Sequence, residues 1–304
     1  MTDLIMPTDG PRVSPRTPEQ VNANVRAELD KATETWGIPN NLARTMACHP
    51  RLAQTEIDYV NSFIFDENVF GEIPRPGNLE DTVLFPQVGF VDRVTKELVI
   101  AVVSLINRSR YSITHHAVIS WGVLAERVAG ATAAERAKRA EAMLLNTVDG
   151  TGVPVFLNQT YEGKPLFTPL QTAAMTLAVS MNRSGHDVTD DEFDALRDAM
   201  RDQARADISV GPLAFQFDAS GPDKAYLDAY VDGMLIELTW CIAHYGGLLN
   251  RWFTALKVRD EEYDVAPGKT FPANYNDAVP ESVKVRNNQL LGLDGWGAAP
   301  GSTS

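Results

Sequence analysis

The sequence is poor in cysteine and has no long apolar run. Its two cysteines, Cys48 and Cys241, lie far apart and match neither a CxxC pair nor the spacing of metal ligands. We therefore expect two reduced thiols, and no disulfide framework or zinc site. The longest apolar run, Leu98 to Ile106, is interrupted only by Ser104. Because about 20 apolar residues are needed to span a bilayer, we expect no membrane-spanning segment.

Positive charge is also scarce. The chain has 27 basic and 40 acidic residues, which gives a formal net charge of −13. A surface of this sign repels phosphate backbones and anionic lipid headgroups, so neither nucleic acid nor a membrane is an expected partner. The N-terminal segment lacks the basic flank and the apolar stretch of a signal peptide. We therefore expect a cytoplasmic protein.

Strand signals are few, whereas helix starts are frequent. No run of alternating residues is flanked by a tight hairpin dipeptide, and the Val153 to Phe156 stretch is short. Threonine followed by proline and then glutamine, typical of a helix start, occurs at Thr17 and again at Thr168, and Thr189 with Glu192 forms a capping box. The hydrophobic share of 44% is that of an ordinary globular protein. The sequence predicts an all-α protein.

The distribution of proline and glycine divides the chain into three parts. Residues 1–16 hold three prolines and are predicted to form an extended N-terminal arm. Residues 17–265 are predicted to form one helical domain, with two helices meeting near Pro50, an irregular connection over 66–85, and long helical stretches over 92–128 and 226–256. Residues 266–304 are predicted to be an irregular tail, with Phe271, Tyr275 and Trp296 as candidate anchors.

Four residues between positions 97 and 116 carry the strongest functional signal. Ser109 follows Glu97 by 12 residues, Ser112 follows Ser109 by 3, and His116 follows Ser112 by 4. This spacing resembles the motif of the alkylhydroperoxidase D (AhpD) and carboxymuconolactone decarboxylase superfamily, in which a glutamate precedes a CxxC pair and a histidine. Serine occupies both cysteine positions here. Weaker matches around His49–Pro50 and Asn250–Arg251 extend the resemblance over about residues 37–258.

The resemblance implies an AhpD-like helical bundle that assembles as a homo-oligomer, a trimer or a hexamer. In the peroxidases of that superfamily the paired thiols are the redox centre, the histidine takes part in a proton relay and the glutamate assists it. Serine can neither form a disulfide nor reduce a peroxide. A carboxylate, histidines and hydroxyl groups remain, and these suit acid–base chemistry.

Helix geometry tests whether Glu97 and His116 can share a site. On one straight helix, 19 residues at 1.5 Å each would hold them about 28 Å apart. If they cooperate, the helix must break, and the polar residues 107–110 mark the place where the apolar run stops. A new helix beginning near Ser109 would carry Ser112 and His116 on the same face.

The leading hypothesis is a cofactor-independent enzyme that transfers protons to or from a small-molecule substrate. His116 would shuttle the proton, Glu97 would act as base or orienter, and the hydroxyl groups of Tyr111, Ser109 or Ser112 would hold a developing oxyanion. The candidate substrate-binding residues are His115, His244 and Arg251, and Arg251 could equally pair with an acid such as Glu237. The reaction would be a C–C cleavage, isomerisation or hydrolysis of an organic acid or lactone.

Two alternatives from other classes stay open. The first is a peroxidase-related protein that uses Cys48 and Cys241. The second is a scaffold without activity that binds a ligand or organises an oligomer, in which Glu97 starts a helix and the serines cap or fill it. A metal site built from Glu97, His115, His116 or His244 is a minor variant, and no metal is part of the leading hypothesis.

Overall fold

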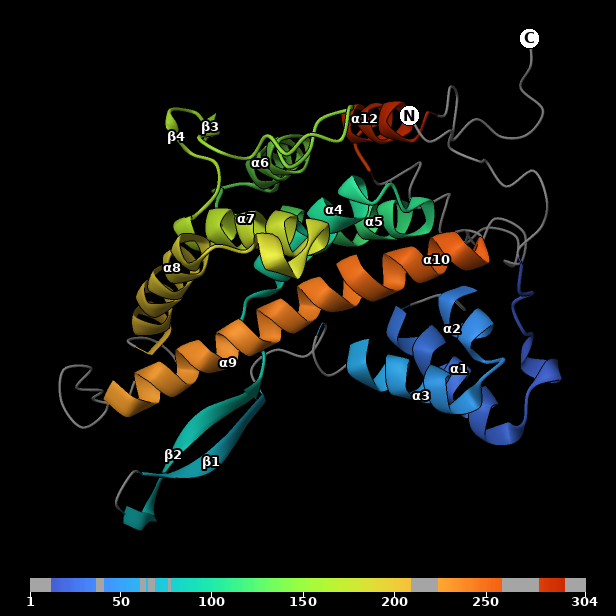
Figure 1. Ribbon diagram of the computed structural model, residues 1–304, viewed down its shortest axis with the longest axis horizontal. Coiled ribbons are helices and arrows are strands. Elements are labelled where there is room, and N and C mark those ends of the chain that lie inside the picture. The colour runs from blue at the N-terminus through green and yellow to red at the C-terminus, as the bar shows by residue number, and fades with distance from the viewer. Residues whose placement is uncertain are drawn as a thin grey trace.

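The computed structural model describes residues 12–36, 41–60, 64, 69–75, 78–208, 224–258 and 279–292. In these ranges the regular secondary structure is helical apart from two 2-stranded antiparallel sheets, which confirms the all-α prediction (Figure 1). Among these residues, no helix has the length and apolar character needed to cross a membrane. The same ranges contain no cluster of three or more His, Cys, Asp or Glu that could hold a metal ion.

The N-terminal helices form a small layer of their own. A 3₁₀ turn over Pro18–Gln20 is followed by α1 (Ala23–Trp36), α2 (Asn41–Met46) and α3 (Pro50–Tyr59). The predicted capping box at Thr17 is present, but it closes only the 3₁₀ turn, and α1 begins later, where Asn22 Oδ1 accepts from the Val25 N–H at 3.0 Å. The predicted break near Pro50 is confirmed. These helices share a satellite core of Val25, Leu29, Ala43, Ala47 and Ile57.

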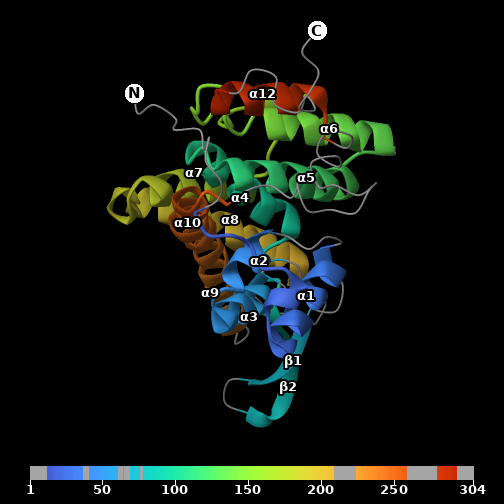
Figure 2. The same ribbon diagram turned by 90° about the vertical axis from the view of Figure 1, so that its right-hand side faces the viewer.

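A β-hairpin occupies most of the segment that was expected to be an irregular connection. Strand β1 (Val69–Arg75) pairs antiparallel with β2 (Asn78–Val88), and the ribbon projects away from the helices (Figures 1 and 2). The sequence prediction was therefore wrong over 69–75 and 78–85. Prolines at positions 74 and 86 argue against strands in a sequence, but both strands of a two-stranded ribbon are edge strands, where proline is tolerated.

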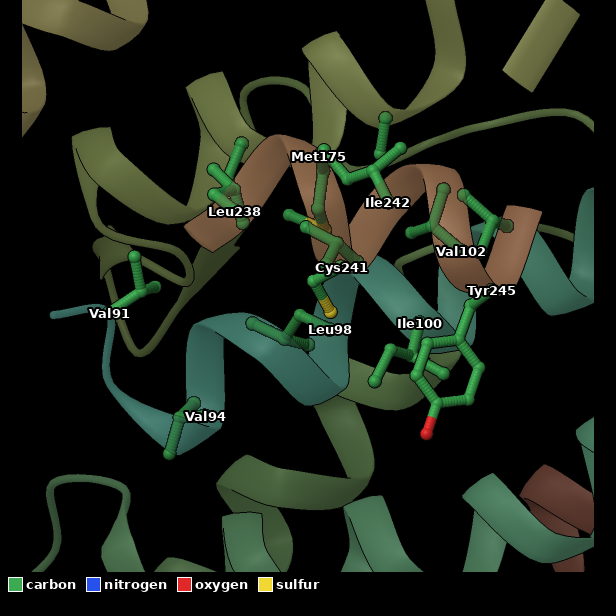
Figure 3. Packing of buried hydrophobic residues seen from close by; sticks show 14 of the residues in the cluster. Val91, Val94, Leu98, Ile100, Val102, Met175, Leu238, Cys241, Ile242 and Tyr245 are labelled. Atoms are coloured by element: carbon green, nitrogen blue, oxygen red, sulfur yellow. The ribbon is translucent and has the colours of Figure 1, made fainter. Parts of the chain in front are cut away.

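The central helices follow the hairpin. They are α4 (Arg93–Ile106), α5 (Arg110–Arg127), α6 (Ala133–Leu145), α7 (Pro169–Arg183) and α8 (Asp190–Ile208), with the short strands β3 (Thr160–Tyr161) and β4 (Lys164–Pro165) before α7 and a 3₁₀ turn (Gly185–Asp187) after it. The capping boxes predicted at Thr168 and Thr189 are both present. Buried side chains from α4, α7 and α9 meet in the main core (Figure 3).

A long helical segment crosses this core. It comprises α9 (Lys224–Ile242), a π-helical stretch η5 (Ala243–Leu249) and α10 (Asn250–Leu256). The prediction of a buried helix over 226–256 is confirmed, because Leu238, Ile242 and Leu249 are each about 1% exposed or less. The π-helical stretch has no sequence signal of its own, and π-helical turns are frequent at functional sites.

The C-terminal segment is not entirely irregular. Helix α12 (Glu281–Leu291) begins after Pro280 and ends at Gly292, whose φ of 66° suits a glycine C-cap. In both views α12 lies beside α6 and above α5 (Figures 1 and 2). Its Val283, Leu290 and Leu291 belong to the main core, so the predicted domain end at residue 265 was too early. The candidate anchors Phe271, Tyr275 and Trp296, and residues 1–11 of the predicted arm, lie outside the described residues.

Candidate functional site

The long helical stretch expected over 92–128 is broken at residues 107–109, as it must be if Glu97 and His116 share a site. Asn107 ends α4, Arg108 has a left-handed φ of 49°, and Ser109 is the N-cap of α5. The Asn107 side-chain amide donates to Asn182 Oδ1 of α7 at 2.9 Å and to the Gly246 carbonyl of η5 at 3.0 Å. These bonds tie the break to two other helices, and α5 folds back along α4.

Folding back brings Glu97 and His116 into contact. Glu97 is 0% exposed, and its Oε2 lies 3.1 Å from His116 Nδ1. The same oxygen accepts a hydrogen bond from Ser120 Oγ at 3.1 Å. Its other oxygen, Oε1, accepts from Arg93 Nε at 2.8 Å. One carboxylate thus joins a guanidinium, an imidazole and a hydroxyl group inside the bundle.

The protonation of this cluster follows from its charges. Burial by itself raises the pKa of Glu97, but the Arg93 guanidinium and the hydrogen bond from His116 outweigh burial and lower the pKa to about 2. The carboxylate is therefore ionised and can only accept hydrogen bonds, so His116 donates its Nδ1–H. In the neutral imidazole, Nε2 then carries the lone pair. This is the arrangement of a general base held by a carboxylate.

A small cavity adjoins His116. Its volume is about 20 Å³, enough for about one water molecule. It is lined by Ser104 of α4, His116 of α5, Leu144 of α6, and Arg286 and Asn287 of α12. The rest of the lining is apolar and comprises Ala101, Leu105, Ile113, Ala117 and Val283.

The two motif serines lie close to the cavity but do not line it. Ser112 is buried, and its Oγ lies 2.7 Å from Ser104 Oγ, so it reaches the cavity only through Ser104. Ser109 is fully buried at the start of α5, and within the described part of the chain its hydroxyl group has no hydrogen-bond partner. Neither hydroxyl group is hydrogen-bonded to His116.

Tyr111 and His115 face a different part of the molecule. The His115 ring stacks on the Tyr111 ring at 3.8 Å, and His115 Nδ1 lies 2.7 Å from the Tyr111 carbonyl oxygen. The Tyr111 hydroxyl group accepts from the backbone N–H of Leu42 in α2 at 3.1 Å. Both residues therefore pack toward α2, and the structure does not bring them to the cavity beside His116.

His244 belongs to a second carboxylate–imidazole pair. Its Nε2 lies 2.9 Å from Glu56 Oε1 of α3. The buried Tyr245 ring lies between the two histidines, with centroids 4.9 Å from His116 and 5.4 Å from His244. His244 is thus near the site without lining its cavity.

Arg251 is exposed and does not pair with Glu237. Glu237 instead lies 3.1 Å from Lys96 Nζ and accepts from the backbone N–H groups of residues 89–91. The carboxylate of Glu237 therefore fixes the chain where it enters α4, and it is a structural group.

The two thiols do not meet. Cys48 is exposed, whereas Cys241 is buried and its sulfur points into the core toward Leu98 (Figure 3). Burial raises the pKa of Cys241 to about 12, with the nearby carboxylates of Glu97 and Glu237 adding to the effect. A thiol with so high a pKa is a poor nucleophile.

Several residues of the site were missed at the sequence level. Arg93 precedes Glu97 by four residues and Ser120 follows His116 by four, so helical spacing alone could have found both. Both ends of α12 also had a sequence signal, namely Pro280 before the helix and Gly292 after it. No local pattern places Arg286 in the same cavity lining as His116, because its position there depends on how α12 packs.

Comparisons with known proteins complete the description of the site. No protein-family model and no curated protein matches this chain. Among solved structures, it is similar to the alkylhydroperoxidase AhpD core of an uncharacterized peroxidase-related protein from Ralstonia eutropha JMP134, with 14% identity, a TM-score of 0.48, and coverage of 83% of this chain and 93% of the other. It is also similar to an uncharacterized peroxidase-related protein from Silicibacter sp. TM1040, with 15% identity, a TM-score of 0.42, and coverage of 85% and 94%.

Proposed function

We propose that the protein is an enzyme that uses the Glu97–His116 pair for proton transfer on a small organic acid or lactone, without a cofactor. The observation that carries the proposal is the contact between the buried, ionised Glu97 carboxylate and His116 Nδ1 at 3.1 Å. The reaction class is C–C cleavage, isomerisation or hydrolysis, as the resemblance to carboxymuconolactone decarboxylases implies.

Each residue of the cluster has a stated part in this chemistry. His116 Nε2 accepts the proton, and the Glu97 carboxylate stabilises the imidazolium that forms. Arg93 and Ser120 hold the carboxylate in one position. Ser104 lines the cavity and donates a hydrogen bond to the oxygen on which negative charge develops, while Ser112 orients the Ser104 hydroxyl group at 2.7 Å.

The size of the cavity favours one competing function. A volume of about 20 Å³ does not admit an organic acid in the conformation described. A cavity too small for a substrate is what a scaffold that has lost its activity would show. Turnover separates the two functions, because a scaffold consumes no substrate whatever its conformation.

The test begins with a mixture of small organic acids and lactones, whose depletion by the native protein is followed by mass spectrometry. With a substrate in hand, His116→Ala and Glu97→Gln are expected to lower kcat by about 10²- to 10⁴-fold, the usual contribution of a positioned general base. His186→Ala is the matched control, because His186 is an exposed histidine outside the site. Full turnover by both site variants would refute the proposed pair. Failure to deplete any compound would favour the scaffold.

A further inference from the structure

Helix α12 forms one wall of the cavity, and α4 and α5 form the wall opposite it. Arg286 and Asn287 of α12 and His116 of α5 line the same space. Arg286 is 8% exposed, and its Nη1 donates to the carbonyl oxygens of Leu144, at 3.1 Å, and Val148, just beyond the end of α6. Its Nε donates to Asn287 Oδ1 at 2.8 Å. A cation that is held in place thus borders the cavity that contains the catalytic imidazole.

The chemistry of the lining indicates what the cavity binds. The charge of Glu97 is already engaged by Arg93, His116 and Ser120. Arg286 is the cationic group of the lining, and the remaining walls are mainly aliphatic. A guanidinium pairs well with a carboxylate, and aliphatic walls favour a short hydrocarbon chain.

We propose that Arg286, assisted by Asn287, recognises the carboxylate of a short aliphatic substrate, and that α12 moves away from α5 and α6 to admit it. The inference rests on the proposed function, because it assigns the group that positions the substrate opposite His116. It also accounts for the small size of the cavity: about 20 Å³ holds a water molecule when α12 is seated, and the substrate enters when α12 lifts.

Binding is tested with butanoate and with butanamide, its neutral analogue of similar shape, by calorimetry on the full-length protein. The native protein is expected to bind butanoate at least tenfold more tightly than butanamide, as a hydrogen bond between charged groups predicts. Arg286→Met should abolish this preference and Arg286→Lys should restore part of it. Arg139→Met is the matched control, since Arg139 also donates to backbone carbonyl groups, those of Pro165 and Leu166, but does not line the cavity.

The outcomes separate this inference from the proposed function. A preference for butanoate that survives in Arg286→Met, or equal binding of butanoate and butanamide by the native protein, would overturn the role of Arg286. Loss of the preference in Arg139→Met as well would show a general effect on folding, and would also count against it. His116→Ala is expected to keep the preference while turnover is lost. The two proposals can therefore fail independently.

The movement of α12 is tested through the reactivity of His116. Diethyl pyrocarbonate is larger than the cavity and His116 is 8% exposed in the described conformation, so modification of His116 is expected to be slow until α12 lifts. Ser282→Ala removes the hydrogen bond between Ser282 of α12 and Glu141 of α6, and should speed modification of His116 roughly two- to tenfold. Modification of the exposed His186 should not change. Modification of His116 as fast as that of His186 in the native protein, or no effect of Ser282→Ala, would show that α12 does not cover the site.

Discussion

Replacing Glu97 by glutamine removes the negative charge from the centre of the buried cluster while keeping the size of the side chain. Arg93 is 4% exposed, and its Nη2 lies 2.6 Å from Glu97 Oε1. In the variant, this guanidinium stays buried opposite a neutral amide. Breaking a buried ion pair by removing one partner costs about 3 to 5 kcal/mol. We therefore expect the free energy of unfolding at pH 7 to fall by about that amount.

The lowered pKa of Glu97 determines how the stability difference between the native protein and Glu97→Gln changes with pH. The folded pKa of Glu97 is about 2, against an ordinary value of 4.5. Because the folded pKa is the lower one, the stabilisation is fully present above pH 4.5 and is lost as the pH falls toward 2. At about 1.4 kcal/mol for each pKa unit, the ionised Glu97 carboxylate contributes about 3 kcal/mol to the free energy of unfolding. Roughly 2 kcal/mol of this contribution is lost by pH 3. Glutamine does not titrate, so the stability difference between the native protein and Glu97→Gln should shrink by roughly 2 kcal/mol between pH 7 and pH 3.

Urea unfolding at pH 7, 5 and 3, followed by far-ultraviolet circular dichroism, measures this difference. The slope of the free energy of unfolding against urea concentration must be the same for both proteins. A different slope would mean that the variant alters the denatured state, and the two stabilities could then not be compared directly. Glu126→Gln on the exposed side of α5 is the control and should stay within about 0.5 kcal/mol of the native protein at pH 7. A difference that stays constant from pH 7 to pH 3 would refute the claim that Glu97 is ionised with a lowered pKa.

Two further predictions address the helix break and the motif serines. In Gly246→Ala, the new Cβ would lie 2.9 Å from Asn182 Oδ1, which accepts from Asn107, so thermal unfolding should show a loss of about 1 to 3 kcal/mol. Gly247→Ala is the control and should be neutral or stabilising, because nothing lies within 4 Å of its Cβ. Ser109→Cys/Ser112→Cys places two thiols three residues apart at the start of α5, where the helix N-terminus lowers a thiol pKa. Thiol titration under oxidising conditions should show a disulfide in the double variant but in neither single variant, with peroxide consumption appearing alongside it. Reduced thiols in the double variant would count against the motif assignment.

The central part of the site could be predicted from the sequence because it depends on local geometry. The fixed rise per residue shows that Glu97 and His116 can meet only if the helix between them breaks, and the polar residues 107–110 mark the place where it does. Helix starts at Thr168 and Thr189 follow from side chains that cap their own backbone. In both cases the atoms that decide the structure lie within a few turns of one another.

The rest depends on contacts between distant segments. His244 meets Glu56 across 188 residues, and Tyr111 faces Leu42 rather than the cavity. The hairpin was missed because its strands contain prolines, and pairing between the two strands stabilises it more than local preference does. Arg286 reaches the site because the buried face of α12 packs on the central helices. Such packing has no signature within a window of a few turns.

The buried cluster also bears on the choice between an enzyme and a scaffold. Removing charges from water costs several kcal/mol for each ion, and well-packed apolar residues in place of a buried ion pair are often neutral or stabilising. Stability alone therefore does not explain why Arg93, Glu97 and His116 lie together in the core, because apolar side chains in such a place are often no less stable. The chain nevertheless places a fully buried, ionised carboxylate against an imidazole that lines a cavity. The proposed proton transfer gives this otherwise costly arrangement a use, and it requires no thiol.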